Sequence, residues 1–232
     1  MCMFTMMNHA RLDVALQGVA HAARAHQIAQ SYAAERKQGR DRASGQPIAI
    51  DQHRDIARQL ARQDMLATTG RLMAYKTFAL METDTHSDLV EFLTPICKSF
   101  CTDAGVEAAH IGIQVLGGYG YLREYRVQQT LRDARICQIY EGTNGIQALD
   151  LIGRKMAQGY GRLLRRFFHP VQEFINEHQA NQDMQEFIFP LAKAFAKLQQ
   201  STAMVAQKGL KNPDEAGAAS VDYLRQFALV AL

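Results

Sequence analysis

Apolar residues along the first stretch of the chain recur every three or four positions, with polar side chains between them. The recurring positions are Leu12, Leu16, Val19 and Ala23. This spacing places them on one face of an α-helix, so we expect a first helix over residues 8–37, ended by Gly39. Residues 38–47 contain Gly, Ser and Pro and are expected to form a connecting loop.

The remainder of the chain continues the helical pattern. Ala, Leu, Gln, Arg and Met dominate long stretches, β-branched residues are scattered rather than alternating, and there are only five prolines. These features predict an all-α fold. Asn144, with Gln147 three residues later, has the form of a reciprocal helix cap, and Pro170 is expected to break the chain. Helices are expected over residues 51–82, 87–116, 145–156, 171–179, 183–208 and 214–232, with a short element over 124–133.

The character of the chain changes after Gly161. Three arginines within residues 162–166 precede an aromatic pair at 167–168, and amphipathic helices follow. We therefore expect one domain over residues 1–160 and an appended helical module over 161–232. The last helix is still apolar at Leu232, so we expect the module to be incomplete. The first residues run straight into a helix, so we expect the N-terminal end of the chain to be incomplete as well.

Composition limits the classes of function. With 232 residues and 47% hydrophobic composition, the chain is neither a disordered protein nor a disulfide-stapled miniprotein. A formal net charge of +3 is low for a protein that binds nucleic acid through phosphate contacts, so no nucleic-acid partner is expected. No apolar run approaches the roughly 20 residues that span a bilayer, and membrane insertion is not expected. Four scattered cysteines fit buried thiols in a reducing cytoplasm, and we assign no metal.

Glu141 is the most informative candidate for chemistry. It follows four mostly apolar residues, precedes Gly142 and lies at the approach to a helix N-terminus. This arrangement suits a carboxylate that acts as a general base in partly dry surroundings. The local pattern is also typical of a glutamate that only supports a helix cap.

Two other stretches suit an anionic ligand. Residues 114–120 place three glycines after a helix, where backbone amides can approach a phosphate. The same glycines are typical of a tight turn at a helix C-terminus, and they do not form a dinucleotide-binding fingerprint. Basic side chains in residues 36–42 suit a diphosphate, although cations are also ordinary partners of a helix C-terminus. They are Arg36, Lys37, Arg40 and Arg42.

Four stretches over residues 8–156 form an ordered series. They read Glu-Arg-Lys at 35–37, Gln-Val-Leu-Gly-Gly-Tyr-Gly at 114–120, Arg-Asp-Ala-Arg-Ile at 132–136 and Ile-Tyr-Glu-Gly-Thr at 139–143. In order and spacing, the series resembles the C-terminal helical domain of the acyl-CoA dehydrogenase family. Residues 140–147 and the helical tail are similar to the longer bacterial branch that includes methylthiopropanoyl-CoA dehydrogenases. The resemblance implies an up-down helical bundle.

The resemblance also implies a reaction. In this family an FAD enzyme removes the α proton of an acyl-CoA thioester while the β hydrogen leaves as hydride to the flavin, giving a trans-2-enoyl-CoA. Glu141 is implied as the base, and the amide of Gly142 as a donor to the thioester oxygen. Arg11 matches the active-site arginine of the family. Some relatives carry the base at the position that matches Ala10, where alanine cannot serve.

Contacts to FAD follow from the same resemblance. Thr143 and Asn144 match contacts to its adenosine part, and Arg36 matches a contact to flavin phosphate across the dimer. After the Arg-Lys pair many members have Thr-Phe-Gly, whereas residues 38–40 read Gln-Gly-Arg, which removes the aromatic side chain at this point. The diphosphate contacts supplied to the neighbouring subunit match Gln114, Gly117 and Gly118.

Family members also carry an N-terminal helical domain and a middle β domain, which this sequence lacks. We therefore expect this chain, as a cut piece or a truncated reading frame, to be inactive alone. An electron-transfer flavoprotein is the implied electron acceptor, and a homo-oligomer, either a dimer or a tetramer, is the implied assembly. Two alternatives stay open: an acyl-CoA oxidase, and a non-catalytic helical assembly module such as the DNA-associated flavoprotein relatives.

Overall fold

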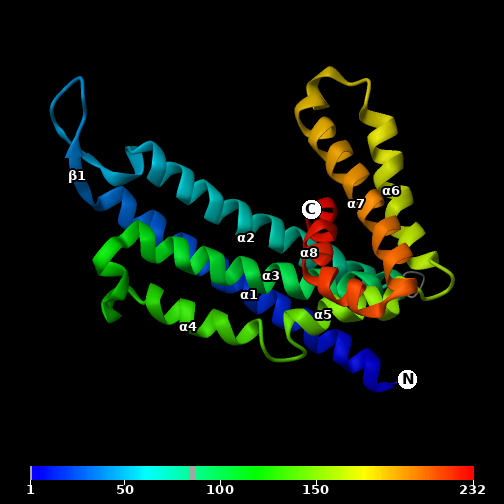
Figure 1. The fold of residues 1–232 in the computed structure, drawn as a ribbon. Coiled ribbons are helices and arrows are strands. Elements are labelled where there is room, and N and C mark those ends of the chain that lie inside the picture. The colour runs from blue at the N-terminus through cyan, green and yellow to red at the C-terminus, as the bar shows by residue number, and fades with distance from the viewer. Residues whose placement is uncertain (1, 84–86) are drawn as a thin grey trace. The chain divides into compact units, whose positions relative to one another are not determined.

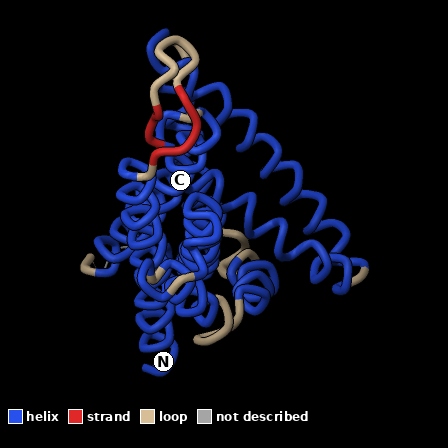
Figure 2. Tube along the Cα trace, turned by 90° about the vertical axis from the view of Figure 1, so that its left-hand side faces the viewer, coloured by secondary structure: helices blue, strands red, loops and turns tan. Residues whose placement is uncertain are grey.

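The computed structural model describes residues 2–83 and 87–232 (Figures 1 and 2). Within these residues the chain forms eight α-helices and one small hairpin. The helices are α1 (Cys2–Glu35), α2 (Arg54–Met81), α3 (Ser87–Leu116), α4 (Val127–Cys137), α5 (Asn144–Asp150), α6 (Arg162–His178), α7 (Gln185–Lys211) and α8 (Pro213–Ala231). The strands are β1 (Lys37–Arg40) and β2 (Pro47–Ala49). The predicted all-α fold is confirmed, and no helix in the described ranges is long and apolar enough to cross a membrane.

The chain packs as two compact units. The first comprises Met1–Ala74 and Ser99–Glu141, and the second comprises Tyr75–Lys98 and Gly142–Leu232. Each unit therefore contains a part of α2 and a part of α3. The division into residues 1–160 and 161–232 that the sequence suggests stays a prediction.

Helices α2 and α3 run antiparallel in the first unit. The side-chain amide of Gln63 donates to the carbonyl oxygen of Ala108 at 2.7 Å, and the thiol of Cys101 donates to the carbonyl oxygen of Gly70 at 3.5 Å. Gln63 is fully buried, so its bond to the α3 backbone fixes the register of the two helices. The buried apolar residues around this contact come from three helices and are Ala22, Ala25, Leu66, Ala67, Ala104, Ala108 and Ala109.

Helices α1 and α4 also run antiparallel. Val127, at the start of α4, packs in one cluster with Ala29 of α1, whereas the thiol of Cys137, the last residue of α4, lies 3.7 Å from the side-chain oxygen of Gln17. Figure 1 shows the two helices side by side. The first unit is therefore an up-down bundle of α1, α2, α3 and α4, as the sequence resemblance implied.

Helices α1 and α3 touch through their backbones. A Cβ atom added at Gly18 on α1 would lie 2.3 Å from the carbonyl oxygen of Cys101 on α3. One added at Gly105 would lie 2.7 Å from the carbonyl oxygen of Gly18. Only glycine leaves room for such a close approach, because any side chain would overlap backbone atoms that cannot rotate away.

The second unit is built around aromatic side chains. Phe227 on α8 is fully buried, and its ring centroid lies 5.5 Å from that of Phe92 on α3 and 5.2 Å from that of Phe167 on α6. Such edge-to-face and tilted contacts stabilise beyond the apolar area that they bury. The other rings of this cluster are Phe168, Phe195 and Tyr223.

The chain break expected at Pro170 is wrong. Helix α6 begins at Arg162, eight residues before this proline, and continues to His178. Proline inside a helix removes one backbone hydrogen bond and disturbs the preceding turn. Pro170 is exposed, so water can serve the disturbed carbonyl groups, while Phe167 and Ile175 are buried and hold the helix by packing. Tertiary packing therefore overrides the local signal.

The loop expected over residues 38–47 is confirmed for residues 41–46, but β1 and β2 flank it as an antiparallel pair, and α1 ends at Glu35 rather than at residue 37. The carboxylate of Asp41 organises the turn by accepting from the amide of Ser44 at 2.7 Å and from the amide of Ala43 at 3.1 Å. These hydrogen bonds, that from Ser44 first, lower the pKa of Asp41. Gly39, expected to end the helix, lies in β1 with φ of 78°.

Candidate active site

Glu141 lies in a tight turn between α4 and α5. Its φ of 54° and the φ of 85° at Gly142 are both left-handed, a conformation that costs a non-glycine residue roughly 1–2 kcal/mol. The side chain of Glu141 is exposed, so the described part of the chain does not supply the partly dry surroundings that the sequence suggested. Before this turn, α4 is displaced from the expected range of 124–133, because Arg126 is also left-handed and helical structure resumes only at Val127.

A cap was expected at the start of α5, but the expectation that Asn144 provides it is wrong. Thr143 is the N-cap of α5, and its hydroxyl accepts from the amide of Ile146 at 3.2 Å. The side-chain oxygen of Asn144 accepts from the ammonium group of Lys98 at 2.9 Å instead. The helix expected over 145–156 is also divided, because α5 ends at Asp150 and a π-helix, Leu151–Lys155, follows.

Replacing Thr143 by alanine removes this cap. We expect the free energy of unfolding to fall by about 1 kcal/mol, because the amide of Ile146 loses its acceptor. Denaturant unfolding of the chain, followed by far-UV circular dichroism, measures the change. Thr143→Ser keeps the hydroxyl and should retain most of the stability, whereas equal stability for the alanine and serine variants would contradict the capping role.

The residue that precedes Glu141 is attached to α1. The hydroxyl of Tyr140 donates to the side-chain oxygen of Gln17, and burial raises the pKa of this tyrosine. Arg11 lies six residues earlier on α1 and is buried, with 7% of its surface exposed. Gln17 and Tyr140 are functional candidates that the sequence reasoning missed, since no local pattern shows a hydrogen bond between residues 123 positions apart.

The glycines at 117 and 118 and Arg36 lie around one concavity of about 310 Å³. Gly117 has φ of 61°, and a Cβ atom added at either glycine would meet nothing within 4 Å, so the backbone here is open to a ligand. The guanidinium group of Arg36 adds a cation suited to phosphate. Gln114 is exposed and does not line this concavity.

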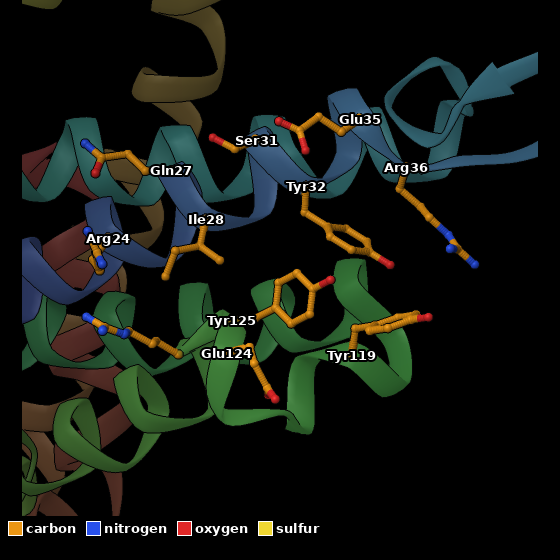
Figure 3. Close-up of a pocket in the computed structure, with 11 residues that line it drawn as sticks. Arg24, Gln27, Ile28, Ser31, Tyr32, Glu35, Arg36, Tyr119, Glu124 and Tyr125 are labelled. Carbon is orange, nitrogen blue, oxygen red and sulfur yellow. The ribbon is translucent and has the colours of Figure 1, made fainter.

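A second concavity, of about 840 Å³, shares Arg36 with the first and contains a tyrosine cluster, Tyr32, Tyr119 and Tyr125. Figure 3 shows the three rings together on α1 and the segment that follows α3. Ring centroids lie 5.4 Å apart for Tyr32 and Tyr125, and the guanidinium carbon of Arg36 lies 5.5 Å from the centroid of Tyr119. The sequence reasoning missed this cluster. Its one trace in the sequence is that several tyrosines occur near the glycines at 117–120.

Cysteines 97, 101 and 137 are buried and reduced. Within the described residues no three His, Cys, Asp or Glu side chains come together in a way that could hold a metal ion.

Comparison with known proteins identifies the family. The family model described as acyl-CoA dehydrogenase, C-terminal domain, matches residues 2–157. The chain belongs to the acyl-CoA dehydrogenase family. A second model, described as acetyl-CoA dehydrogenase C-terminal like, matches residues 167–232.

Individual members of the acyl-CoA dehydrogenase family support the assignment. The 3-methylmercaptopropionyl-CoA dehydrogenase of Ruegeria pomeroyi is 38% identical over 96% of this chain and 40% of its own length. The structure of Caenorhabditis elegans ACDH-11 in complex with C11-CoA covers 97% of this chain and 38% of its own, with a TM-score of 0.82 at 18% identity, and shares the fold. Butyryl-CoA dehydrogenase from Megasphaera elsdenii is 30% identical over 64% of this chain and 36% of its own, with a TM-score of 0.57. The chain thus spans about two fifths of the length of these relatives.

Proposed function

We propose that this chain is the C-terminal part of an FAD-dependent acyl-CoA dehydrogenase in which Glu141 takes the α proton of an acyl-CoA thioester to give a trans-2-enoyl-CoA. Family membership supports the proposal. The observation that carries it is the left-handed turn at Glu141, directly after Tyr140, whose hydroxyl is bonded to Gln17 on α1. A carboxylate held there needs only exclusion from bulk water to act as the base.

Two groups are proposed to hold the substrate. The backbone amide of Gly142, next to Glu141, donates to the thioester oxygen and stabilises the negative charge that develops there. Arg11 supplies a buried cation on α1, the helix that also holds Tyr140 through Gln17. Both roles follow from the resemblance and are compatible with the turn and with the burial described above.

The residues around the glycines fit a cofactor that carries a diphosphate. The backbone at Gly117 and Gly118 is unobstructed, and Arg36 lines the same concavity, so amides and a guanidinium group can meet phosphate oxygens. When bound, FAD supplies the acceptor for the substrate's β hydride. The residues proposed to contact it are Arg36, Gln114, Gly117 and Gly118 at its phosphates in the neighbouring subunit, with Thr143 and Asn144 at its adenosine part.

The wider setting of the enzyme follows from the same proposal. The substrate is an acyl-CoA, the electron acceptor is an electron-transfer flavoprotein, and the enzyme is a cytoplasmic homo-oligomer, a dimer or a tetramer, without nucleic-acid partners. Residues 1–160 form the flavin- and substrate-contacting helical domain, and residues 161–232 form the appended module.

The test is an anaerobic visible spectrum of the intact enzyme, in which this chain follows the N-terminal helical and middle β domains of the family. Adding a medium-chain acyl-CoA should bleach the flavin absorbance, because the flavin becomes reduced. The control is the 232-residue chain with added FAD, which should show no bleaching. A flavin-loaded intact enzyme that no straight-chain acyl-CoA reduces would overturn the proposal. Rapid reoxidation of the reduced enzyme by air, rather than by electron-transfer flavoprotein, would assign an oxidase instead.

A further inference from the structure

Two lysine side chains are fully buried in the second unit, Lys98 on α3 and Lys155 at the end of the π-helix. A buried ammonium group costs several kcal/mol unless fixed acceptors surround it. The ammonium of Lys155 pairs with the carboxylate of Glu91, and that of Lys98 donates to the side-chain oxygen of Asn144 at 2.9 Å. Burial lowers the pKa of Lys155, while the bond to Glu91 opposes that shift.

These two contacts lie at the two ends of one helical segment, which consists of α5 and the π-helix that follows it. Glu91 and Lys98 are seven residues apart on α3, which is close to two helical turns, so they share a face of that helix. Asn144 begins α5, and Lys155 ends the π-helix that continues it. The segment between them therefore runs antiparallel to α3, and buried Ala148 and Leu151 lie along it.

The contact at Lys98 also sets the orientation of the Asn144 amide. An ammonium group only donates hydrogen bonds, so it faces the oxygen of the amide and directs the nitrogen elsewhere. The turn before α5 is held further by the side chain of Gln147, which donates to the carbonyl oxygen of Gly142 at 3.1 Å. Lys98 thus fixes which atoms the start of α5 presents.

We propose that Lys98 is a positioning residue for the cofactor: its buried ammonium group orients Asn144 and fixes the turn at the start of α5 that receives the adenosine part of FAD. This inference rests on the proposed function, which assigns Asn144 and Thr143 to that contact. Lys155 is the last residue of the π-helix that continues α5, and its ammonium group pairs with Glu91 rather than with Asn144. It therefore provides a matched control of equal burial and equal charge.

The test measures the dissociation constant of FAD in the intact enzyme for Lys98→Met, Asn144→Ala and the double variant. We expect each single variant to raise the constant about tenfold. The double variant should match Asn144→Ala alone, because Lys98 is proposed to act on the cofactor through the Asn144 amide. Lys155→Met should lower Tm yet keep the constant within about twofold, which separates positioning from general stability. If Lys98→Met does not fold, Lys98→Gln keeps a neutral donor, and the same equality of double and single variants is expected.

The failures are distinguishable. If Asn144→Ala weakens FAD binding while Lys98→Met leaves it unchanged, the positioning role is wrong and the proposed cofactor contact stands. If the effects of the two single variants multiply in the double variant, Lys98 acts independently of Asn144 and the inference is likewise overturned. If Asn144→Ala leaves the constant unchanged, the cofactor contact itself is wrong, and the inference that rests on it falls too.

Discussion

Replacing Glu141 by glutamine in the intact enzyme lowers kcat about a thousandfold. Glutamine keeps the size of the side chain but cannot accept the α proton, so flavin reduction by acyl-CoA becomes slow while FAD and substrate still bind. Anaerobic stopped-flow measurement of flavin bleaching gives the rate directly. The matched control is Glu173→Gln, an exposed glutamate on α6 whose replacement should leave the rate unchanged.

Two results for Glu141→Gln have to be told apart: an unchanged rate, and a slow rate caused by loss of FAD. A rate for Glu141→Gln within about threefold of the unmodified enzyme means that another group takes the proton, because removing a true base costs at least about a hundredfold. A slow variant that has also lost its FAD reports a damaged turn rather than a missing base. Flavin content measured on the same sample separates these two explanations.

Replacing Gly18 by alanine should destabilise the chain by about 3 kcal/mol. Elsewhere in a helix this substitution is favourable by about 1 kcal/mol, so the sign itself tests the backbone contact. The new methyl group would overlap the carbonyl oxygen of Cys101, and relief requires α1 and α3 to separate. Denaturant and thermal unfolding of the chain measure the change.

The control for Gly18 is Gly153→Ala. Gly153 is exposed, lies in the π-helix and has nothing within 4 Å of an added Cβ atom, so its replacement should be neutral or slightly stabilising. Equal Tm values for Gly18→Ala and the unmodified chain would show that α1 and α3 do not touch in solution as described.

Local spacing predicted the long helices well and their interruptions poorly. The third helix was expected over 87–116, and α3 spans Ser87–Leu116, because its apolar face and the glycines after it are both local signals. Pro170 was misjudged because its helix is held by rings from α3, α7 and α8, which lie far away in sequence. The boundary between β1 and α1 was missed because strand pairing with β2 is not visible in a pattern of single residues.

The candidate site shows the same limit. The sequence placed Glu141 before a capped helix, and the structure confirms that turn, while the role of Glu141 as a base stays a prediction. The cap was assigned to Asn144 rather than to Thr143 because both side chains are good caps. The choice is decided by Lys98, 46 residues away, which takes the oxygen of Asn144. The arrangement of Tyr140 on Gln17 likewise depends on a fold that brings α4 beside α1.

The tyrosine cluster has an optical consequence. The chain contains no tryptophan and eight tyrosines, so its intrinsic ultraviolet fluorescence comes from tyrosine alone. Three of the eight line the concavity next to the candidate diphosphate site, and one of them stacks under the guanidinium group of Arg36. Tyr32 and Tyr119 also line the candidate diphosphate site, so a phosphate group bound there would change their surroundings and therefore their emission. The unlabelled protein therefore carries its own reporter for titrating that groove.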